Sequence, residues 1–207
     1  QDNLMRIGLM AGYGRSSSST TSITGTHSKG DLNGYSIGAY GSWFEDPSAL
    51  TGGYADSWLQ YSWFKNHVTG EDLASESYNS QGVTASIEGG YIFNAGQSAS
   101  YNYYLQPKVQ GIWMGVKANG HTEASNTYVS GTGNGNLQTR FGLKAFFTER
   151  KPNDAILHGN RFKPFIEATW IHNTKDFGVD MSHPATGSYT VKQGGAANIA
   201  EMKVGLE

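Results

Sequence analysis

Cysteine is absent from this sequence of 207 residues, and only five prolines occur in it. The lack of cysteine excludes disulfides, thiolate metal ligands and a cysteine nucleophile. The formal net charge is -2, so the sequence offers no basic surface for nucleic acid. The longest apolar run, residues 111–116, is far shorter than the roughly 20 residues that a membrane-spanning helix needs. These absences direct attention to the pattern of side chains along the chain.

Length and composition predict one domain that covers residues 1–207. No secretory signal opens the chain, because Gln1, Asp2 and Asn3 are not a charged segment followed by an apolar one. We therefore expect these residues to come from within a longer polypeptide. A membrane β-barrel shows lipid only every second side chain, so a chain without long apolar runs can still cross a membrane as strands.

Residues 161–177 show the period-two alternation of a β-strand most clearly. Phe162, Ile166 and Trp170 share one parity there, and Lys163 and Glu167 share the other. The same alternation recurs in the segments 4–15, 31–44, 54–65, 81–93, 103–117, 136–147 and 198–207. The sequence therefore predicts about eight strands. Pro107 lies inside one of them and predicts a bulge or a local break in pairing there.

The connections between these segments alternate in length. Residues 16–30, 66–80, 118–133 and 175–196 are long and aperiodic, which predicts loops, whereas 45–48, 94–97 and 149–160 are shorter. Long loops on one side and short turns on the other are typical of an antiparallel up-and-down barrel in a bacterial outer membrane. We therefore expect the long connections outside the cell and the short ones in the periplasm. A soluble Greek-key sandwich has no reason to keep this alternation.

Charged residues fall on the parity opposite to the apolar one. An Arg or Lys that faced lipid would cost about 2–4 kcal/mol at the membrane midplane. We therefore predict that one group of residues, termed the charged set, faces the lumen: Arg6, Asp56, Glu88, Lys108, Arg140, Lys144, Lys163, Glu167, Glu201, Lys203 and Glu207. Met5, Leu9, Ile37, Leu59, Ile87, Leu105, Leu143, Ile166 and Val204 should face lipid. The mixed signs predict no strong ion selectivity, and ion pairs that serve only the barrel's own stability are an equally good interpretation.

No catalytic, cofactor or metal site is indicated by the sequence. Its six histidines form no H-E-x-x-H motif or comparable close pair, so we interpret them as loop and interface residues. Residues 131–135, Gly-Thr-Gly-Asn-Gly, are a weak candidate for a phosphate-binding loop. We predict that the chain is not an enzyme and needs no cofactor.

Four separated segments carry a resemblance to a known family. They are YADSWLQYSWF at 54–64, YLQPKVQGIWM at 104–114, GNLQTRFG at 135–142 and PFIEATWIHNTK at 164–175. In this order they resemble the C-terminal β-barrel translocator domain of autotransporters, which belong to type V secretion, and most closely the pertactin and AIDA-like adhesin group. The resemblance covers essentially the whole chain.

The resemblance implies a barrel of about twelve strands, with a linker helix in the lumen that joins it to an exported passenger. This chain would match the third to the tenth strand, without the first two and the last two. The implied location is the bacterial outer membrane. The implied partners are membrane lipid, the chain's own passenger and linker helix, and the barrel assembly machinery, with the barrel as a monomer and no nucleic acid. Some autotransporter barrels cut their linker with lumenal acids, but the resemblance to the adhesin group and the absence of a linker lead us to name no catalytic residue.

Three alternative functions remain open from the sequence. A porin-like channel would differ from a translocator by a conductance that persists when nothing plugs it. An outer-membrane barrel enzyme would need an acid and a histidine, or a serine and a histidine, paired at one rim. A soluble all-β binding module is disfavoured by the sided connections and by the charges on the non-apolar parity.

Overall fold

The structure, a computed structural model, describes residues 3–23, 25–46, 50–71, 74–150 and 163–207. These residues form thirteen strands: β1 (Leu4–Thr21), β2 (His27–Phe44), β3 (Gly52–Gly70), β4 (Glu76–Gln97), β5 (Tyr101–Met114), β6 (Lys117–Ala118), β7 (His121–Thr122), β8 (Tyr128–Thr132), β9 (Asn136–Glu149), β10 (Pro164–Asn173), β11 (Gly178–His183), β12 (Gly187–Lys192) and β13 (Asn198–Leu206). No helix long and apolar enough to cross a membrane occurs in the described residues. The all-β prediction is confirmed.

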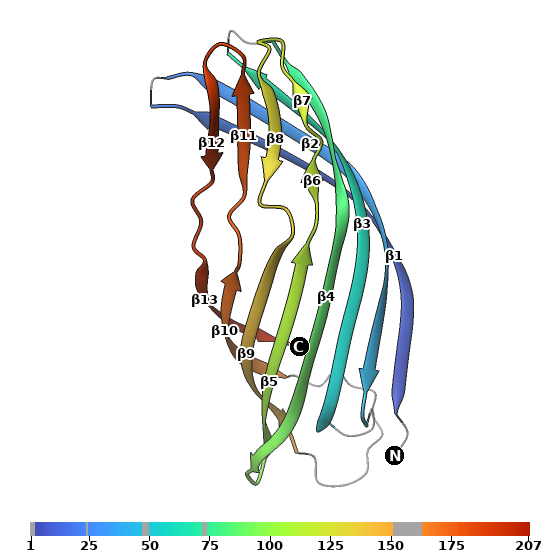
Figure 1. Cartoon of the computed structure of the whole chain (residues 1–207). Coiled ribbons are helices and arrows are strands. Elements are labelled where there is room, and N and C mark those ends of the chain that lie inside the picture. Colours follow the sequence, from blue (N-terminus) through green and yellow to red (C-terminus); the bar gives the residue numbers. More distant parts are fainter. Residues whose placement is uncertain (1–2, 24, 47–49, 72–73, 151–162) are drawn as a thin grey trace.

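The long strands form one antiparallel sheet, the main sheet, in the order β1-β2-β3-β4-β5-β9-β10-β13, with the short β6 beside β4 (Figure 1). Each of these eight strands contains one of the predicted segments or most of it. Neighbours in the sheet are neighbours in the chain except where the second sheet intervenes between β5 and β9 and between β10 and β13. The up-and-down order predicted from the sequence is therefore confirmed.

The two ends of this order do not meet. Within the described residues, β1 pairs only with β2 and β13 pairs only with β10. The main sheet is thus a curved arc with two open edges (Figure 1). This agrees with the resemblance, which implies that these eight strands are part of a barrel of about twelve.

The long connections are largely strand, which corrects the prediction of loops there. The β1–β2 ladder runs without interruption from Leu4↔Phe44 to Thr21↔His27, so most of residues 16–30 is hairpin. Similarly, β3 ends at Gly70 and β4 begins at Glu76, inside the predicted loop 66–80. In the last third of β1, the serines and threonines from Ser16 to Thr21 are exposed on both faces of the strand. A strand that meets water on both faces needs no alternation of apolar and polar residues, which is why the sequence pattern missed it.

Residues predicted as the two other long loops form a second sheet, in the order β12-β11-β8-β7. It lies at the same end as the β1–β2 and β3–β4 hairpins, and the short connection between β4 and β5 lies at the opposite end with the N-terminus (Figure 1). The weak phosphate-loop candidate at 131–135 belongs to the passage from β8 into β9. The predicted connection 149–160 falls mostly outside the described residues, as do Arg161 and Phe162.

Pairing between β4 and β5 is interrupted at the position that Pro107 predicted. The register passes from Gly90↔Lys108 to Phe93↔Leu105, so Pro107 lies in a gap on the β4 side. On the other side Pro107 remains in register with Leu143 of β9. Proline has no backbone N–H, so it cannot donate a hydrogen bond to β4, and it keeps its pairing only with β9.

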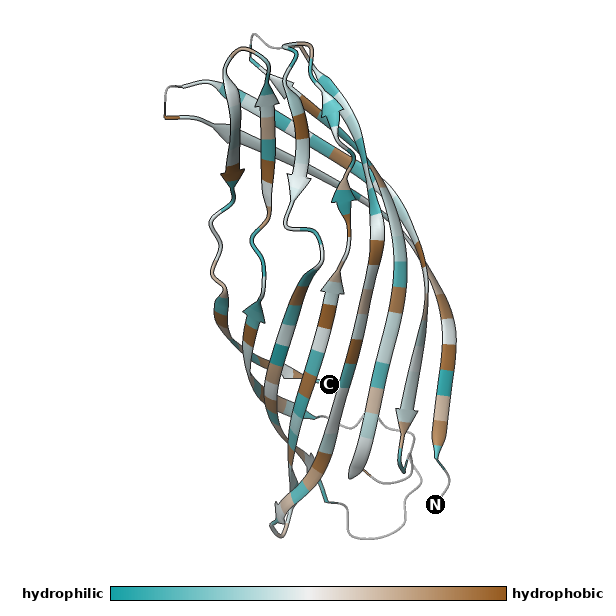
Figure 2. Cartoon of the chain, viewed as in Figure 1, coloured by the Kyte–Doolittle hydropathy of each residue, from teal (hydrophilic) through white to brown (hydrophobic). Residues whose placement is uncertain are grey.

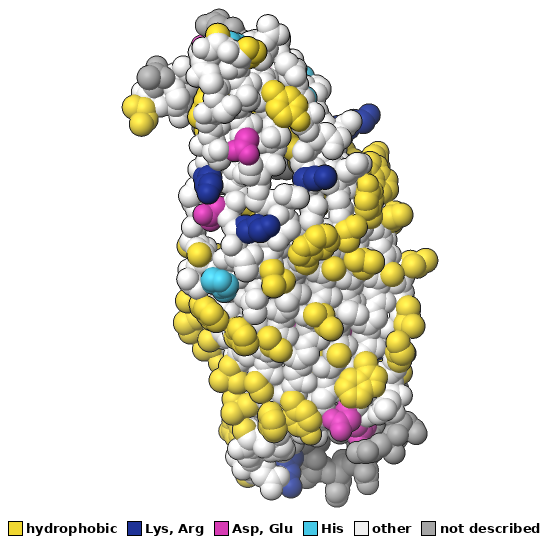
Figure 3. All heavy atoms as spheres, in the orientation of Figure 1, with side chains coloured by type: hydrophobic (Ala, Val, Ile, Leu, Met, Phe, Trp, Pro, Cys, Tyr) yellow, Lys and Arg dark blue, Asp and Glu magenta, His cyan; other side chains and the backbone are white. Residues whose placement is uncertain are grey.

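The two faces of the main sheet differ sharply in chemistry. All the residues predicted to face lipid are exposed, from Leu105 at 39% to Leu9 at 88%. Apolar and polar residues alternate along the strands in Figure 2, and hydrophobic side chains cover much of the middle and lower part of the face seen in Figure 3. We call this apolar surface the outer face. The other, inner face holds the buried side chains, which are Tyr54, Tyr104, Phe146, Ile171, Lys144, Glu167, Thr169 and several small polar residues.

Glycines on the inner face make room for aromatic rings on the neighbouring strand. Gly8 is in register with Tyr40, and a Cβ at Gly8 would lie 2.4 Å from that ring. Gly90 stands in the same relation to Tyr54, where the nearest ring atom would be 2.6 Å away. Both distances are shorter than any real contact of a Cβ atom, so these positions require glycine if the rings keep their places.

Candidate functional site

The charged set lies on one face of the main sheet, and the pairing register shows this directly. Residues paired across neighbouring strands point to the same side of a sheet. One row of such pairs runs Arg6, Ser42, Asp56, Glu88, Gln110 and Arg140. A second row contains Lys108, Gly142, Thr169 and Glu201, and a third contains Gln106, Lys144, Glu167 and Lys203. The backbones of Lys163 and Glu207 also pair with each other, directly before the start of β10 and directly after the end of β13.

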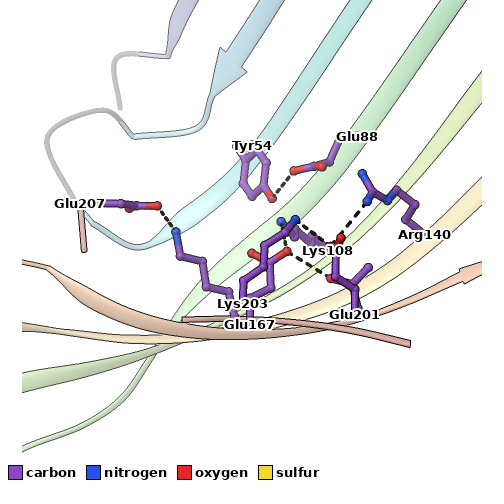
Figure 4. A network of polar contacts seen from close by, with 10 residues as sticks. Tyr54, Glu88, Lys108, Arg140, Glu167, Glu201, Lys203 and Glu207 are labelled. Carbon is purple, nitrogen blue, oxygen red and sulfur yellow. Dashed lines mark hydrogen bonds and ion pairs between the residues drawn. The ribbon is translucent and has the colours of Figure 1, made fainter. Parts of the chain in front are cut away.

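The most enclosed ion pair of the inner face joins Lys108 on β5 to Glu167 on β10, with 2.8 Å between Nζ and Oε1. Their side chains are 21% and 8% exposed. The hydroxyl of Thr169 also donates a hydrogen bond to Oε1 of Glu167, at 3.1 Å. Glu167 is thus held by two donors, and β9 lies between the two strands that the ion pair joins (Figure 4).

A second group of ions lies on β9 and β13. Glu201 contacts Lys203 at 2.7 Å and Arg140 at 3.6 Å, so one carboxylate serves two cations. Figure 4 shows these side chains converging on the same space as Lys108 and Glu167. Arg140, Lys108, Glu167 and Lys203 together line a small cavity of about 60 Å³.

A third group lies toward the ends of β9, β10 and β13. Glu207 forms ion pairs with Lys144 and with Lys163, the latter at 2.9 Å. The ammonium group of Lys144 is 4.3 Å from the ring centre of Phe165, and that of Lys163 is 4.2 Å from the ring centre of Phe146. These contacts place two cations against aromatic faces, an arrangement that is favourable in addition to the ion pairs.

The part of the inner face on β1 to β4 is organised differently. The hydroxyl of Tyr54 donates a hydrogen bond to Glu88 at 3.0 Å, and the guanidinium of Arg6 lies 5.9 Å from the ring centre of Phe44. All ion pairs of the charged set among the described residues lie on β5, β9, β10, β13 and the residues directly flanking them. Arg6, Asp56 and Glu88 therefore present charge that no described ion pair neutralises.

Asn136 at the start of β9 is a central residue of the inner face that the sequence did not single out. It is 2% exposed. Its Oδ1 accepts hydrogen bonds from the backbone N–H groups of Thr174 and Lys175, both at 3.0 Å, and its Nδ2 donates to Oδ1 of Asn173 at 3.1 Å. This one amide joins β9 to the point where the chain leaves β10. Its partners lie 37 to 39 residues away in the sequence, so no local pattern could have identified it.

The arrangement supports a polar wall along one face of the main sheet. No cluster of three or more histidine, aspartate or glutamate side chains suited to a metal ion occurs in the described part of the chain. Four of the histidines, His27, His67, His121 and His172, contact neighbouring hydroxyl, amide, aromatic or carbonyl groups at strand ends. Mixed charges on one face and apolar side chains on the other are what a strand wall between water and lipid requires.

Comparison with known proteins agrees with this architecture. The autotransporter β-domain family model matches residues 1–207. The chain is 44% identical to the protein YuaQ of Escherichia coli K12 over 99% of its length, and 38% identical to the autotransporter adhesin AIDA-I of Escherichia coli over 97%. It spans only 15% and 16% of the lengths of these two relatives.

Two solved structures resemble the fold. The transport unit of AIDA-I from Escherichia coli matches 98% of this chain with a TM-score of 0.83 and 36% identity, and the chain covers 64% of that structure. The β-domain of the Bordetella autotransporter BrkA matches 98% of the chain with a TM-score of 0.51 at 16% identity, which shows the fold alone. The resemblance inferred from the four sequence segments and the predicted fold class are both confirmed.

Proposed function

The chain belongs to the autotransporter β-domain family, and we propose that it forms the wall of an outer-membrane translocator barrel that secretes an N-terminal passenger domain and anchors it at the cell surface. The observation that carries the proposal is the meander of long strands with one apolar and one charged face, which follows the AIDA-I transport unit along nearly the whole chain. In this proposal residues 1–207 act as one domain.

The outer face is proposed to meet membrane lipid. Its exposed residues, such as Leu59, Ile87 and Leu143, lie in the middle of long strands, and aromatic residues such as Tyr13, Tyr35 and Trp63 follow them toward one strand end. An apolar band bordered by aromatic rings matches the solvation of a bacterial outer-membrane barrel. The second sheet and the ends of the β1–β2 and β3–β4 hairpins would then lie outside the cell.

The inner face is proposed to line the lumen and to contact the passenger polypeptide during export. A barrel of about twelve strands leaves room for a helix or an extended hairpin but not for a folded domain. Glu167, Glu201 and Glu207 each pair with a lysine of the wall itself, so they need no ligand to be satisfied. The charges of Arg6, Asp56 and Glu88 remain available to a polypeptide that passes over β1 to β4.

Further features of the function follow from the family. We propose an adhesin-like passenger, because AIDA-I is named as an autotransporter adhesin and most of its length lies outside the matched region. We also propose insertion by the barrel assembly machinery, a linker helix in the lumen and a monomeric barrel. The family and its adhesin member support transport rather than catalysis.

Photo-crosslinking in living cells tests the proposal. A benzophenone amino acid is introduced at Gln60, which lies on the inner face, or at its chain neighbour Leu59, which is 55% exposed on the outer face. Both variants are made in the protein with its passenger attached and with an epitope tag in the passenger. We expect position 60 to form an adduct with the passenger polypeptide and position 59 to form none.

Surface exposure of the passenger completes the test. Trypsin added to intact cells should remove the tag, while a periplasmic marker stays intact. Retention of the tag inside cells whose barrel is folded in the outer membrane would refute the translocator function. A steady ionic conductance from the purified protein with its passenger attached would instead favour the porin-like channel.

A further inference from the structure

A cavity of about 380 Å³ lies where the second sheet faces the ends of β3 and β4. We call it the mouth pocket. Val68 and Tyr78 line it from the main sheet, and Val129, Val179 and Met181 line it from the second sheet. Its volume is within the range of about 300–1,000 Å³ that is typical of ligand sites.

The pocket lies on the same side of the chain as the charged face, as the register shows. Val68 is in register with Glu76, and Asn66 with Tyr78, and these residues share the parity of Asp56 and Glu88 on β3 and β4. At the mouth pocket, branched and thioether side chains gather on this side beside polar residues such as Glu76 and His121. An apolar concavity of this size is typical of a surface that binds a ligand or a partner.

Polar contacts brace the two walls of the pocket against each other. The ring of Tyr78 stacks on the imidazole of His121, with 4.8 Å between ring centres and an angle of 9°. The backbone N–H of Ala124 donates to Oε1 of Glu76 at 3.0 Å, which ties the β7–β8 turn to the start of β4. These contacts join the two walls of the pocket. Glu76 and Glu123 also give its rim negative charge.

We propose that the mouth pocket binds an apolar segment of the passenger polypeptide as that polypeptide leaves the lumen, with a lysine or arginine beside the segment contacting the acidic rim. The proposal rests on the proposed function, because it needs a polypeptide that emerges at this end. Most of the length of the relatives YuaQ and AIDA-I lies outside the matched region, so in those proteins a long polypeptide adjoins the barrel.

The position of the pocket argues for a polypeptide rather than for lipid. The outer-face apolar residues of β3 and β4 end near Trp63 and Val83, and Val68 and Tyr78 lie several residues further toward the second sheet, on the opposite face. A lipid chain would have to leave the outer face to reach them. A segment that has passed along the charged face meets the pocket directly.

Cysteine protection tests the proposal without disturbing the barrel. Val129→Cys places a thiol in the pocket, and Tyr128→Cys places one beside it on the other face of β8. Each is made in the protein with its passenger and in the same barrel with the passenger deleted. We expect a thiol reagent to modify Val129→Cys about tenfold more slowly when the passenger is present, and Tyr128→Cys at the same rate in both proteins.

A second substitution identifies the apolar contact as the cause. Met181→Gln, added to Val129→Cys, should restore most of the lost reactivity, because burying a methionine side chain stabilises a contact by an amount that corresponds to about tenfold or more in occupancy. Fast modification of Val129→Cys both with and without the passenger would overturn the proposal. Slow modification in both proteins would also overturn it and would indicate that a small molecule or lipid fills the pocket. If an epitope-tagged passenger fails to reach the cell surface, the proposed translocator function is rejected together with the pocket proposal. If the passenger reaches the surface but Val129→Cys is not protected, only the pocket proposal is rejected.

Discussion

The ion pair between Lys108 and Glu167 should stabilise the barrel far more than the pair between Lys29 and Asp31. Lys108 and Glu167 are 2.8 Å apart with side chains 21% and 8% exposed, whereas Lys29 and Asp31 are 3.5 Å apart with side chains 61% and 28% exposed. At an effective dielectric constant of about 20, the attraction between the first two charges is about 6 kcal/mol. Desolvation of both ions offsets much of this attraction. We expect a net coupling energy of about 2 kcal/mol for the enclosed pair and a much weaker coupling for the exposed pair.

A double-mutant cycle on the barrel folded in lipid vesicles measures both couplings from urea unfolding. Glu167→Gln alone should lower the free energy of unfolding by about 2–3 kcal/mol, because it leaves the ammonium of Lys108 without its anion in a confined space. Adding Lys108→Met should recover most of that loss, since no unpaired charge then remains in this space. The same cycle with Lys29→Met and Asp31→Asn is the control. Equal couplings in the two cycles would refute the reasoning that the low exposure of Lys108 and Glu167 strengthens their attraction.

Three further predictions concern the faces, the sidedness and the glycines. Ile37→Arg, on the outer face, should lower the free energy of unfolding in lipid by about 2–4 kcal/mol, whereas Ser36→Arg, on the inner face, should change it by less than about 1 kcal/mol; similar losses would reject the assignment of faces. Cysteines at Ser18 and Ser188 should react with a membrane-impermeant reagent on intact cells and a cysteine at Ser98 should not, so reversed labelling would reject the orientation. Gly90→Val should lower the yield of folded, heat-modifiable barrel and lower the free energy of unfolding by about 1–3 kcal/mol, because its Cβ would lie 2.6 Å from the Tyr54 ring. As the control, Gly111→Ala should fold as well as the parent, because a Cβ there meets nothing within 4 Å.

The strands that cross between two different solvents could be predicted from the sequence. Residues such as Ile87 and Glu88 alternate because one must suit lipid and the other water, and this alternation sets both the strand and its face. Where a strand has water on both faces, this alternation of apolar and polar residues disappears. The ends of β1 and β2 continue as a paired hairpin with water on both sides, and the second sheet formed where the pattern predicted loops.

Contacts between distant segments could not be read from the sequence either. The charges of Glu167 and Lys108 were assigned to one face, but their pairing across β9 depends on the register between strands, which alternation alone leaves free. Tyr54 was not singled out, although it supplies the hydrogen bond to Glu88. Its hydroxyl reaches Glu88 because Gly90 leaves space for the ring, so the contact needs two positions that are 36 residues apart.

The uneven distribution of ion pairs on the inner face bears on how a polypeptide would pass along it. Glu167, Glu201 and Glu207 are each held by a lysine of the wall itself, so displacing them would leave those lysines without partners. Arg6 and Asp56 carry no such constraint among the described contacts, and they lie in one row of paired positions with Ser42 between them. In the proposed translocator, a passing polypeptide would therefore exchange contacts over β1 to β4 at little cost, whereas the ion pairs of β5, β9, β10 and β13 would resist rearrangement. We expect this division to keep β5, β9, β10 and β13 rigid in the proposed translocator, while β1 to β4 bind successive passenger residues weakly.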